Sequence, residues 1–275
     1  QKGRGFPAGE HVEKWHALPP GHDPATGKLR KVSSANPAYT AVFGRGLAEL
    51  LHEREDVVAI TAAMPSGTGV GIVAAEHPSR VFDVGIAEGH AVTFAAGMAT
   101  RGLRPVVAIY STFLQRAYDN VIHDVALQRL PVTFAMDRAG FVGEDGETHM
   151  GLYDIPYMLS VPNMTVAAPK DSREMLGMLR TAVSHDGPFA FRYPRDVSPD
   201  IAPPMADIAS VPVGTWEVLR PGRDVAILGW LGVFQVGFAY ALFTRGVRGV
   251  RAFDATLLTL IEPVLNPVWT WLVHG

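Results

Sequence analysis

The sequence predicts an α/β fold in which a parallel sheet carries helices on both faces. Short apolar runs alternate with segments of helical periodicity from about residue 39 to residue 193. Strands that alternate with helices of this length are typical of parallel sheets covered on both sides. Polar, glycine-bearing loops follow several of the apolar runs, and such sheets bind ligands beyond the carboxyl ends of their strands. We therefore expect the chemistry of this protein in those loops.

The first predicted elements are a helix, two strands and a second helix. Residues 41–53 place apolar side chains at helical spacing, and residues 57–60 form a short apolar run typical of a buried strand. Residues 81–84 predict another strand. Residues 87–100 predict a helix that ends before Gly102.

The central elements repeat this alternation. Residues 105–110 and 132–136 predict strands, and residues 114–127 between them predict a helix. The second of these strands leads into a glycine-rich loop at 137–151. A loop that holds several acids, an arginine and a histidine is unusual for a purely structural connection.

A last strand–helix–strand unit completes the predicted sheet. Residues 164–168 predict a short strand and residues 189–193 predict the final one. Between them, residues 171–184 predict a helix with Asp171 or Ser172 as its N-cap.

Composition narrows the classes of function. The 275 residues are 48% hydrophobic and 19% charged, which fits one large globular domain with additional segments. The net charge of −3 gives no electrostatic argument for binding nucleic acid or an anionic membrane surface, and it favours a cytoplasmic protein. The absence of cysteine excludes disulfides, thiolate zinc sites and cysteine nucleophiles. No serine-hydrolase elbow, phosphate-binding P-loop or His-Glu-x-x-His zinc motif occurs.

Glu88 is a candidate acid–base residue because it lies where a predicted strand turns into a helix. Its neighbours Ile86 and Ala87 are apolar, so partial desolvation of the carboxylate would raise its pKa. The structural alternative is a glutamate in the first helical turn that complements the helix dipole.

Tyr110, Phe113 and Arg116 are spaced by three residues and follow a predicted strand into a helix. This spacing places them on one face. A phenol, an aromatic ring and a guanidinium together suit an anionic substrate such as a phosphate ester. The structural alternative is a surface arginine beside two packed aromatic rings.

The glycine-rich loop and the last strand supply further candidates. Asp145 could orient the imidazole of His149 for proton transfer. The same two residues could instead be a metal pair, but nothing nearby completes a site, so we predict no metal on this chain. Arg192 and Arg195 end the last strand, and one of the two should face the crevice.

Taken together and in order, five segments resemble the 1-deoxy-D-xylulose-5-phosphate synthase family. They are residues 83–88, 110–116, 137–140, 145–149 and 192–195. The resemblance implies a transketolase-like pyrimidine-binding domain and thiamine diphosphate as the cofactor. It also implies the condensation of pyruvate with glyceraldehyde 3-phosphate and the release of carbon dioxide.

The resemblance also implies roles for the cofactor contacts. Glu88 would bond the ring nitrogen of the aminopyrimidine and drive formation of its imino tautomer, so the cofactor itself performs the hard chemistry. Phe113 would stack on the aminopyrimidine, and Ile86 and Met64 would flank it. Gly89 departs from many relatives, which carry a side chain there, and we do not expect this departure to abolish cofactor contact.

For the substrates, the resemblance implies two groups of residues. Tyr110, Arg116 and Arg195 would clamp the phosphate of glyceraldehyde 3-phosphate. A second group would hold the intermediate derived from pyruvate and control its proton transfers: Arg138, Asp145 and His149.

The family also needs a Gly-Asp-Gly segment that binds magnesium and the diphosphate, and no such segment occurs in this sequence. We therefore expect that half of the site on another chain and no synthase activity from this chain alone. Relatives form dimers, so a homodimer is expected as well. The alternative function is the pyrimidine-domain subunit of a split transketolase-like enzyme.

The expected domain organisation has four parts. Residues 1–36 would be a linker, although a disordered tail fits them equally well, and residues 37–200 would be the pyrimidine-binding domain. Residues 201–228 would be the connection to, and the start of, a truncated third domain, and the resemblance to the synthase family ends after about residue 229. Residues 229–275 would be an atypical apolar helical tail.

The apolar tail leaves three interpretations open. Residues 225–243 carry no charge and approach the length of a membrane span, so membrane tethering by residues 225–273 is one interpretation. Residues 257–275 resemble part of a drug/metabolite transporter, which indicates a fused gene whose product is non-catalytic and membrane-associated. The third interpretation is a shortened third domain whose apolar segments pack on the sheet.

Overall fold

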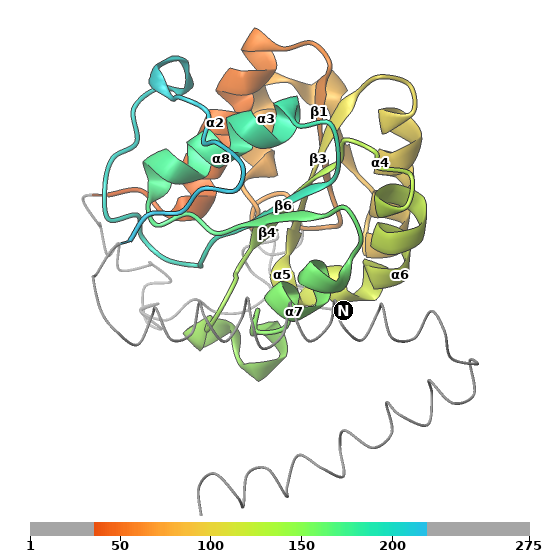
Figure 1. The fold of residues 1–275 in the computed structure, drawn as a ribbon. Coiled ribbons are helices and arrows are strands. Elements are labelled where there is room, and N and C mark those ends of the chain that lie inside the picture. The colour runs from red at the N-terminus through yellow and green to blue at the C-terminus, as the bar shows by residue number, and fades with distance from the viewer. Residues whose placement is uncertain (1–35, 219–275) are drawn as a thin grey trace, which may run out of the picture. The chain divides into compact units, whose positions relative to one another are not determined.

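The computed structural model describes residues 36–218, and its centre is a six-stranded, fully parallel sheet (Figure 1). The strand order is β2-β1-β3-β4-β6-β5, and every neighbouring pair is parallel. The strands are β1 (Val57–Thr61), β2 (Val81–Asp83), β3 (Arg104–Tyr110), β4 (Thr133–Asp137), β5 (Thr165–Ala167) and β6 (Phe189–Arg192). The predicted α/β class is confirmed, and all six predicted strands are present.

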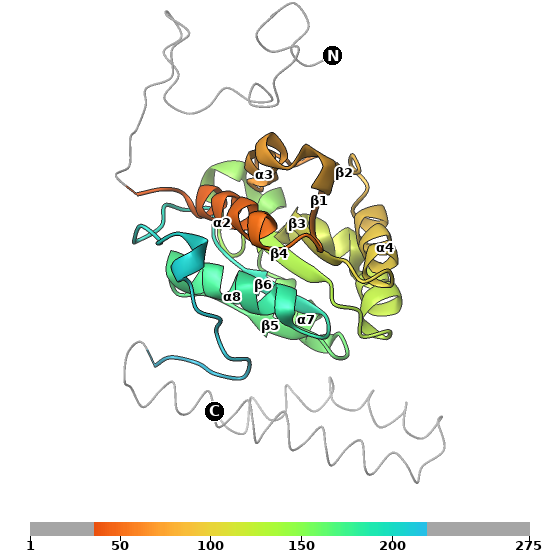
Figure 2. The same cartoon turned by 90° about the horizontal axis from the view of Figure 1, so that it is seen from above.

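Helices cover both faces of the sheet (Figures 1 and 2). One apolar core lies under α2 (Tyr39–Glu53), α3 (Val70–Glu76) and α8 (Ser172–Ser184). The opposite core lies under α4 (Glu88–Ala99), α7 (Asp154–Ser160) and the helical segment 111–126. The inner strands β1, β3, β4 and β6 are mostly buried, so their sequences are apolar runs rather than alternating ones.

Of the two predicted N-caps of α8, Asp171 is the one observed, and its carboxylate accepts a hydrogen bond from the backbone N–H of Glu174 at 2.8 Å. This bond satisfies one of the donors that a helix N-terminus leaves unpaired. A Cβ at Gly46 would lie 2.3 Å from a methyl carbon of Leu176, so the glycine lets α2 pack closely against α8.

The predicted helix 114–127 is wrong in detail, because the segment is divided. It consists of α5 (Ser111–Leu114), a 3₁₀ turn η3 (Gln115–Ala117), α6 (Tyr118–Asn120) and a π-helical turn η4 (Val121–Ala126). The sequence prediction missed α3 and α7, because seven residues give too few turns for apolar periodicity to be recognised. Short 3₁₀ turns complete the described elements: η2 (Pro78–Arg80), η5 (Gly143–Asp145), η6 (Glu147–His149) and η7 (Met205–Asp207).

After β6 the described chain runs back over α8 without a further strand. Met205 and Ile208 are buried against the core that α2 and α8 share. Residues 1–35 of the predicted linker, residues 219–228 of the predicted connection and the predicted apolar tail lie outside the described residues. Within residues 36–218, no helix is long and apolar enough to cross a membrane.

Candidate functional site

The order of the strands places a crevice at the carboxyl ends of β1 and β3. After β1 the chain adds β2 on one side and then β3 on the other, so the connections leave in opposite directions at this point. A cavity of about 310 Å³ opens there. The residues that line it are Ala63, Met64, Ser66, Gly67, Tyr110, Arg138, Asp145 and His149. Five of these eight were predicted as site residues from the sequence.

The loop after β1 forms one wall of the cavity. Ala63 has a left-handed backbone (φ 59°), and its N–H donates to the Asp83 carboxylate at 2.7 Å. A Cβ at Gly67 would lie 1.7 Å from the Tyr110 hydroxyl, so this position must be glycine for the phenol to point into the crevice. The sequence analysis did not select Gly67, although the glycines of this loop were the available signal.

Arg138 is held on several sides at the end of β4. Its guanidinium lies 3.8 Å from the centre of the Tyr110 ring, and its Nη1 donates to the carbonyl of Gly67 at 2.8 Å. Its backbone is left-handed (φ 60°), which is uncommon outside glycine and occurs most often at functional sites. Burial raises the pKa of Tyr110 to about 12, so the phenol stays protonated and can donate a hydrogen bond at neutral pH.

Asp145 lies between two guanidinium groups that come from different strands. Its Oδ2 accepts from Nε of Arg138 at 2.9 Å, and its Oδ1 lies 3.1 Å from Nη1 of Arg195. In the described structure the two oxygens of Asp145 meet these arginines, so the predicted pairing of Asp145 with His149 stays a prediction. His149 is instead 3.0 Å from the hydroxyl of Thr148.

Glu88 is the first residue of α4 and is only 4% exposed, so the expected burial is confirmed. Nη1 of Arg116 donates to its Oε1 at 2.8 Å. The Arg116 guanidinium also lies 5.1 Å from the centre of the Phe113 ring. Ile86 is 81% exposed and does not line the cavity.

The aromatic rings connect these two regions. Phe113 stacks on Tyr110 at 5.6 Å between ring centres, and the ring of His149 meets its edge at 5.1 Å. The predicted shared face of Tyr110, Phe113 and Arg116 is therefore present. The two arginines of the expected phosphate clamp have different carboxylate partners, since Arg116 binds Glu88 and Arg195 binds Asp145.

Asp137 is a further buried carboxylate that the sequence analysis named only as part of a motif. The Thr40 hydroxyl donates to its Oδ2 at 2.8 Å, and Nη1 of Arg138 lies 3.3 Å from its Oδ1. Burial raises the pKa of Asp137 to about 6, and Arg138 and Thr40 oppose that shift. The carboxylate that supports Arg138 therefore changes its charge near neutral pH.

Arg192, the last residue of β6, and Arg195, three residues later, lie in different environments. Nε of Arg192 donates to Oδ2 of the buried Asp154 at 2.7 Å, and Nη2 reaches Oδ1 at 3.2 Å. Arg195 is the one that faces the crevice residues, as its contact with Asp145 shows.

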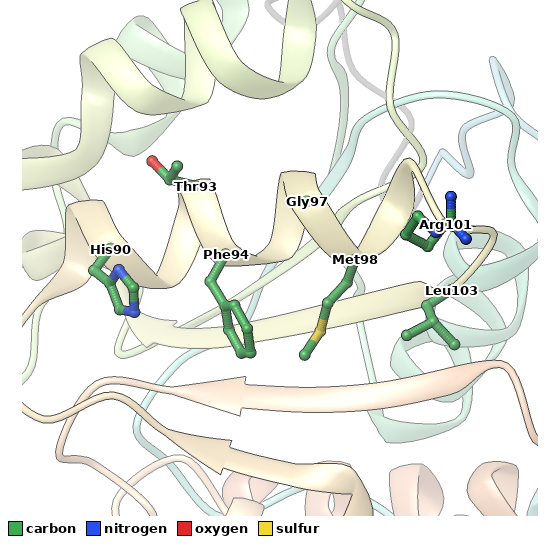
Figure 3. Close-up of a pocket in the computed structure, with 7 residues that line it drawn as sticks. All are labelled: His90, Thr93, Phe94, Gly97, Met98, Arg101 and Leu103. Atoms are coloured by element: carbon green, nitrogen blue, oxygen red, sulfur yellow. The ribbon is translucent and has the colours of Figure 1, made fainter.

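Two other features of the described surface lie outside this site. An apolar hollow of about 440 Å³ runs along α4, where His90, Phe94 and Met98 project from one side of the helix (Figure 3). Gly89 precedes them, and a Cβ there would lie 2.9 Å from the Asn120 side-chain oxygen. The helix α4 therefore approaches α6 more closely than a side chain at this position would comfortably allow.

A group of possible metal ligands lies at the ends of α2 and α3. The ligand atoms of His52, Glu76 and His77 lie within 4.8 Å of one another. Both ring nitrogens of His77 already have partners, namely the carbonyl of Ala48 at 3.2 Å and the guanidinium of Arg80 at 2.9 Å. A cation at this group would compete with the positive charge of Arg80.

Similarity to known proteins agrees with this geometry. 1-Deoxy-D-xylulose-5-phosphate synthase 1 of Geobacter sulfurreducens is 52% identical over 91% of this chain and 39% of its own length. The synthase of Aquifex aeolicus is 50% identical over 90% of this chain and 39% of its own length. This chain therefore spans about two fifths of these curated relatives. The match to synthase 2 of G. sulfurreducens covers 97% of this chain, so it extends past residue 229, where we expected the resemblance to end.

Solved structures share the fold. A protein described as a split gene transketolase, inactive beta4 tetramer, superposes with a TM-score of 0.59 at 29% identity, over 69% of this chain and 61% of that one. Transketolase from Leishmania mexicana gives a TM-score of 0.54 at 22% identity, over 63% and 28% of the two chains. Residues 35–199 match the family described as transketolase, pyrimidine binding domain. The chain belongs to this family and carries its pyrimidine-binding domain.

Proposed function

We propose that this chain supplies the pyrimidine-binding half of a 1-deoxy-D-xylulose-5-phosphate synthase. The observation that carries the proposal is one continuous series of contacts across the carboxyl edge of the sheet. It begins at the buried carboxylate of Glu88 and ends at the guanidinium of Arg195. The named relatives at about 50% identity support the same activity.

The Glu88 end fits an aminopyrimidine ring. Such a ring needs an acidic partner for a ring nitrogen and apolar contact on its faces. Glu88 offers a carboxylate at the start of a helix. Arg116, which binds this carboxylate, also lies over the Phe113 ring, so the acid and the aromatic ring belong to the same part of the site. Thiamine diphosphate, when bound, supplies a carbanion equivalent that attacks carbonyl carbons. Glu88 would hold a proton at the ring nitrogen, and Met64 and Ile86 would exclude water around the ring.

The cavity end fits a small anionic substrate. In our proposal, Tyr110 and Arg195 bind the phosphate of glyceraldehyde 3-phosphate. Arg138 joins them, because it contacts the Tyr110 ring and shares Asp145 with Arg195. Arg116, the third member of the expected clamp, pairs with Glu88 in the described structure. His149 borders both the cavity and Phe113, so it would move protons on the substrate side, and Asp145 would act beside it.

A complete enzyme requires a second half that binds magnesium and the diphosphate. No Gly-Asp-Gly segment occurs in these 275 residues, so we propose that this half comes from a partner domain. Homodimerisation and a cytoplasmic location are parts of the same proposal.

The experiment measures product formation from pyruvate and glyceraldehyde 3-phosphate with magnesium and thiamine diphosphate. This chain alone should give no turnover, and addition of the diphosphate-binding part of a relative should give turnover. Glu88→Ala should then lower the rate at least about a thousandfold, equivalent to about 4 kcal/mol. Glu55→Ala changes an exposed glutamate and is the matched control. A Glu88→Ala rate within about tenfold of the parent would contradict the role of Glu88.

A split transketolase-like subunit is the second candidate, supported by the 29% identity to the split gene transketolase. Turnover of a ketose phosphate such as xylulose 5-phosphate, which is bound in one of the similar transketolase structures, in place of pyruvate would favour it. The reconstituted pair should be given both substrate sets in parallel.

A further inference from the structure

The carboxylate of Asp145 occupies the position that an anionic ligand would take between the two cavity arginines. One oxygen meets Nε of Arg138 at 2.9 Å and the other meets Nη1 of Arg195 at 3.1 Å. An arginine pair binds a phosphate or carboxylate through the same kind of contact, with parallel N–H groups directed at separate oxygens. The described site is therefore already filled by a carboxylate of its own chain.

Arg138 does not depend on Asp145 for its position. It also bonds the carbonyl of Gly67, lies beside Asp137 and covers the ring of Tyr110. Asp145 itself lines the cavity and is partly exposed. If its carboxylate left, the guanidinium of Arg138 would keep three other contacts and would face an open cavity.

The segment that carries Asp145 has a fixed base and glycines on both sides of the aspartate. Its base is fixed, because Gly140 and Gly151 exchange two backbone hydrogen bonds of 2.8 and 2.9 Å. Within it, Gly143 (φ 55°) and Gly146 (φ 83°) flank Asp145 in conformations that favour glycine. In the described structure, a Cβ at either glycine would meet open space, so these residues serve the backbone rather than a close contact.

We propose that Asp145 is an internal competitor for the anion site. It neutralises Arg138 and Arg195 in the unliganded protein, and a phosphate-bearing substrate must displace it to bind. The proposal rests on the proposed clamp of Arg138 and Arg195 and adds a regulatory contact to it. Binding then couples to movement of the segment 143–149, because the carboxylate must leave as the phosphate enters.

The test is calorimetric titration of the full chain with inorganic phosphate at low ionic strength. Asp145→Asn removes the competing charge and should tighten phosphate binding about tenfold. This is the gain expected if the internal pair closes the site in about nine-tenths of molecules. Asp145→Glu restores a carboxylate and should return the affinity towards that of the parent.

The matched control is Asp186→Asn. Asp186 also pairs with an arginine, Arg104, but it lies on the surface outside the cavity, so this variant makes the same change in net charge. Its phosphate affinity should stay within about twofold of the parent. Thermal unfolding of each variant verifies that the fold is retained.

The outcomes separate this inference from the clamp itself. Arg195→Ala could weaken phosphate binding while Asp145→Asn does not tighten it beyond the Asp186→Asn control. In that case the proposal that Asp145 competes with phosphate is wrong, and the proposed anion site at the two arginines is retained. If neither the parent nor Asp145→Asn binds phosphate, the arginine pair is no anion site and both ideas fail. Glyceraldehyde 3-phosphate as a second titrant should give the same order of affinities.

Discussion

Two arginine–aspartate contacts at the end of β6 use the same residue types but differ in setting. Arg192 holds Asp154 with two hydrogen bonds, and Asp154 is 1% exposed. Arg195 is three residues further along, and it shares Asp145 with Arg138 at the wall of a cavity. The first contact fastens α7 to the sheet. The second lies where a ligand can compete for the same charges.

The difference teaches that burial of the carboxylate, rather than pairing, separates the two contacts, because the side chain of Asp154 is 0% exposed and that of Asp145 is 22% exposed. A buried charge that loses its partner cannot turn to water, so the first pair is costly to break. A cavity carboxylate that loses its partner can be solvated, so the second pair is cheap to open. A substrate-binding site requires ion pairs that a ligand can open, such as the contacts of Asp145.

The largest expected effect on stability comes from removing Arg192, and the matching removal of Arg195 should have a much smaller one. Arg192→Ala should lower the free energy of unfolding by about 3–5 kcal/mol, because it leaves the Asp154 carboxylate buried and unpaired. Arg195→Ala should lower it by less than about 1 kcal/mol, because Arg195 is 36% exposed and Arg138 still pairs with Asp145. Urea titration of the two variants measures both values. Equal losses of stability would remove the distinction between the two pairs.

Asp137 sharpens the comparison, because it is buried like Asp154 but supports the cavity arginine. Its pKa is about 6 in the folded protein and about 3.8 when unfolded, so the folded state binds the extra proton. The resulting stability is fully present below pH ~4 and is lost as the pH rises through ~6. Asp137→Asn mimics the protonated carboxyl and should remove this loss.

The measurement is the free energy of unfolding of parent and Asp137→Asn between pH 4 and pH 8. The variant should gain on the parent by up to about 3 kcal/mol across this range. A difference that does not vary with pH would show that Asp137 keeps one charge state throughout.

A smaller effect is expected at the glycine that makes room for Tyr110. Gly67→Ala places a methyl group against the phenol hydroxyl and should cost about 1–3 kcal/mol of stability. It should also weaken phosphate binding, because Tyr110 and Arg138 must shift together. Gly97→Ala is the control, since a Cβ there meets nothing within 4 Å in the described structure and alanine favours a helix by up to about 1 kcal/mol. A Gly67→Ala variant as stable as the parent and equally able to bind phosphate would contradict this account.

Much of the fold was predictable because it follows from local patterns. Six apolar runs became the six strands, and Asp171 capped its helix as expected. The segment 111–126 was harder, because its apolar spacing suits a continuous helix while its backbone contains a 3₁₀ turn and a π turn. Only packing against α4 and the sheet selects those turns.

The candidate site was predictable in its members more than in its pairings. Residues at the carboxyl ends of parallel strands must gather at one edge of the sheet, which is why Met64, Tyr110 and Arg138 meet at the cavity. The partners of Asp145 could not be derived from the sequence. In the structure it pairs with Arg195, which is distant in the chain, whereas the nearby His149 contacts Thr148. The same applies to Arg116, which crosses from its own turn to the start of α4.

The sequence by itself determined the class of the sheet, the edge at which chemistry gathers and the residue types available there. These depend on apolar periodicity and on the order of strands and helices, which are properties of neighbouring residues. The tertiary structure decided which carboxylate meets which arginine, and that Arg195 rather than Arg192 faces the crevice. Those outcomes depend on burial and on distances between segments far apart in the chain, and charge pairs are stable or exchangeable according to how much water can reach them.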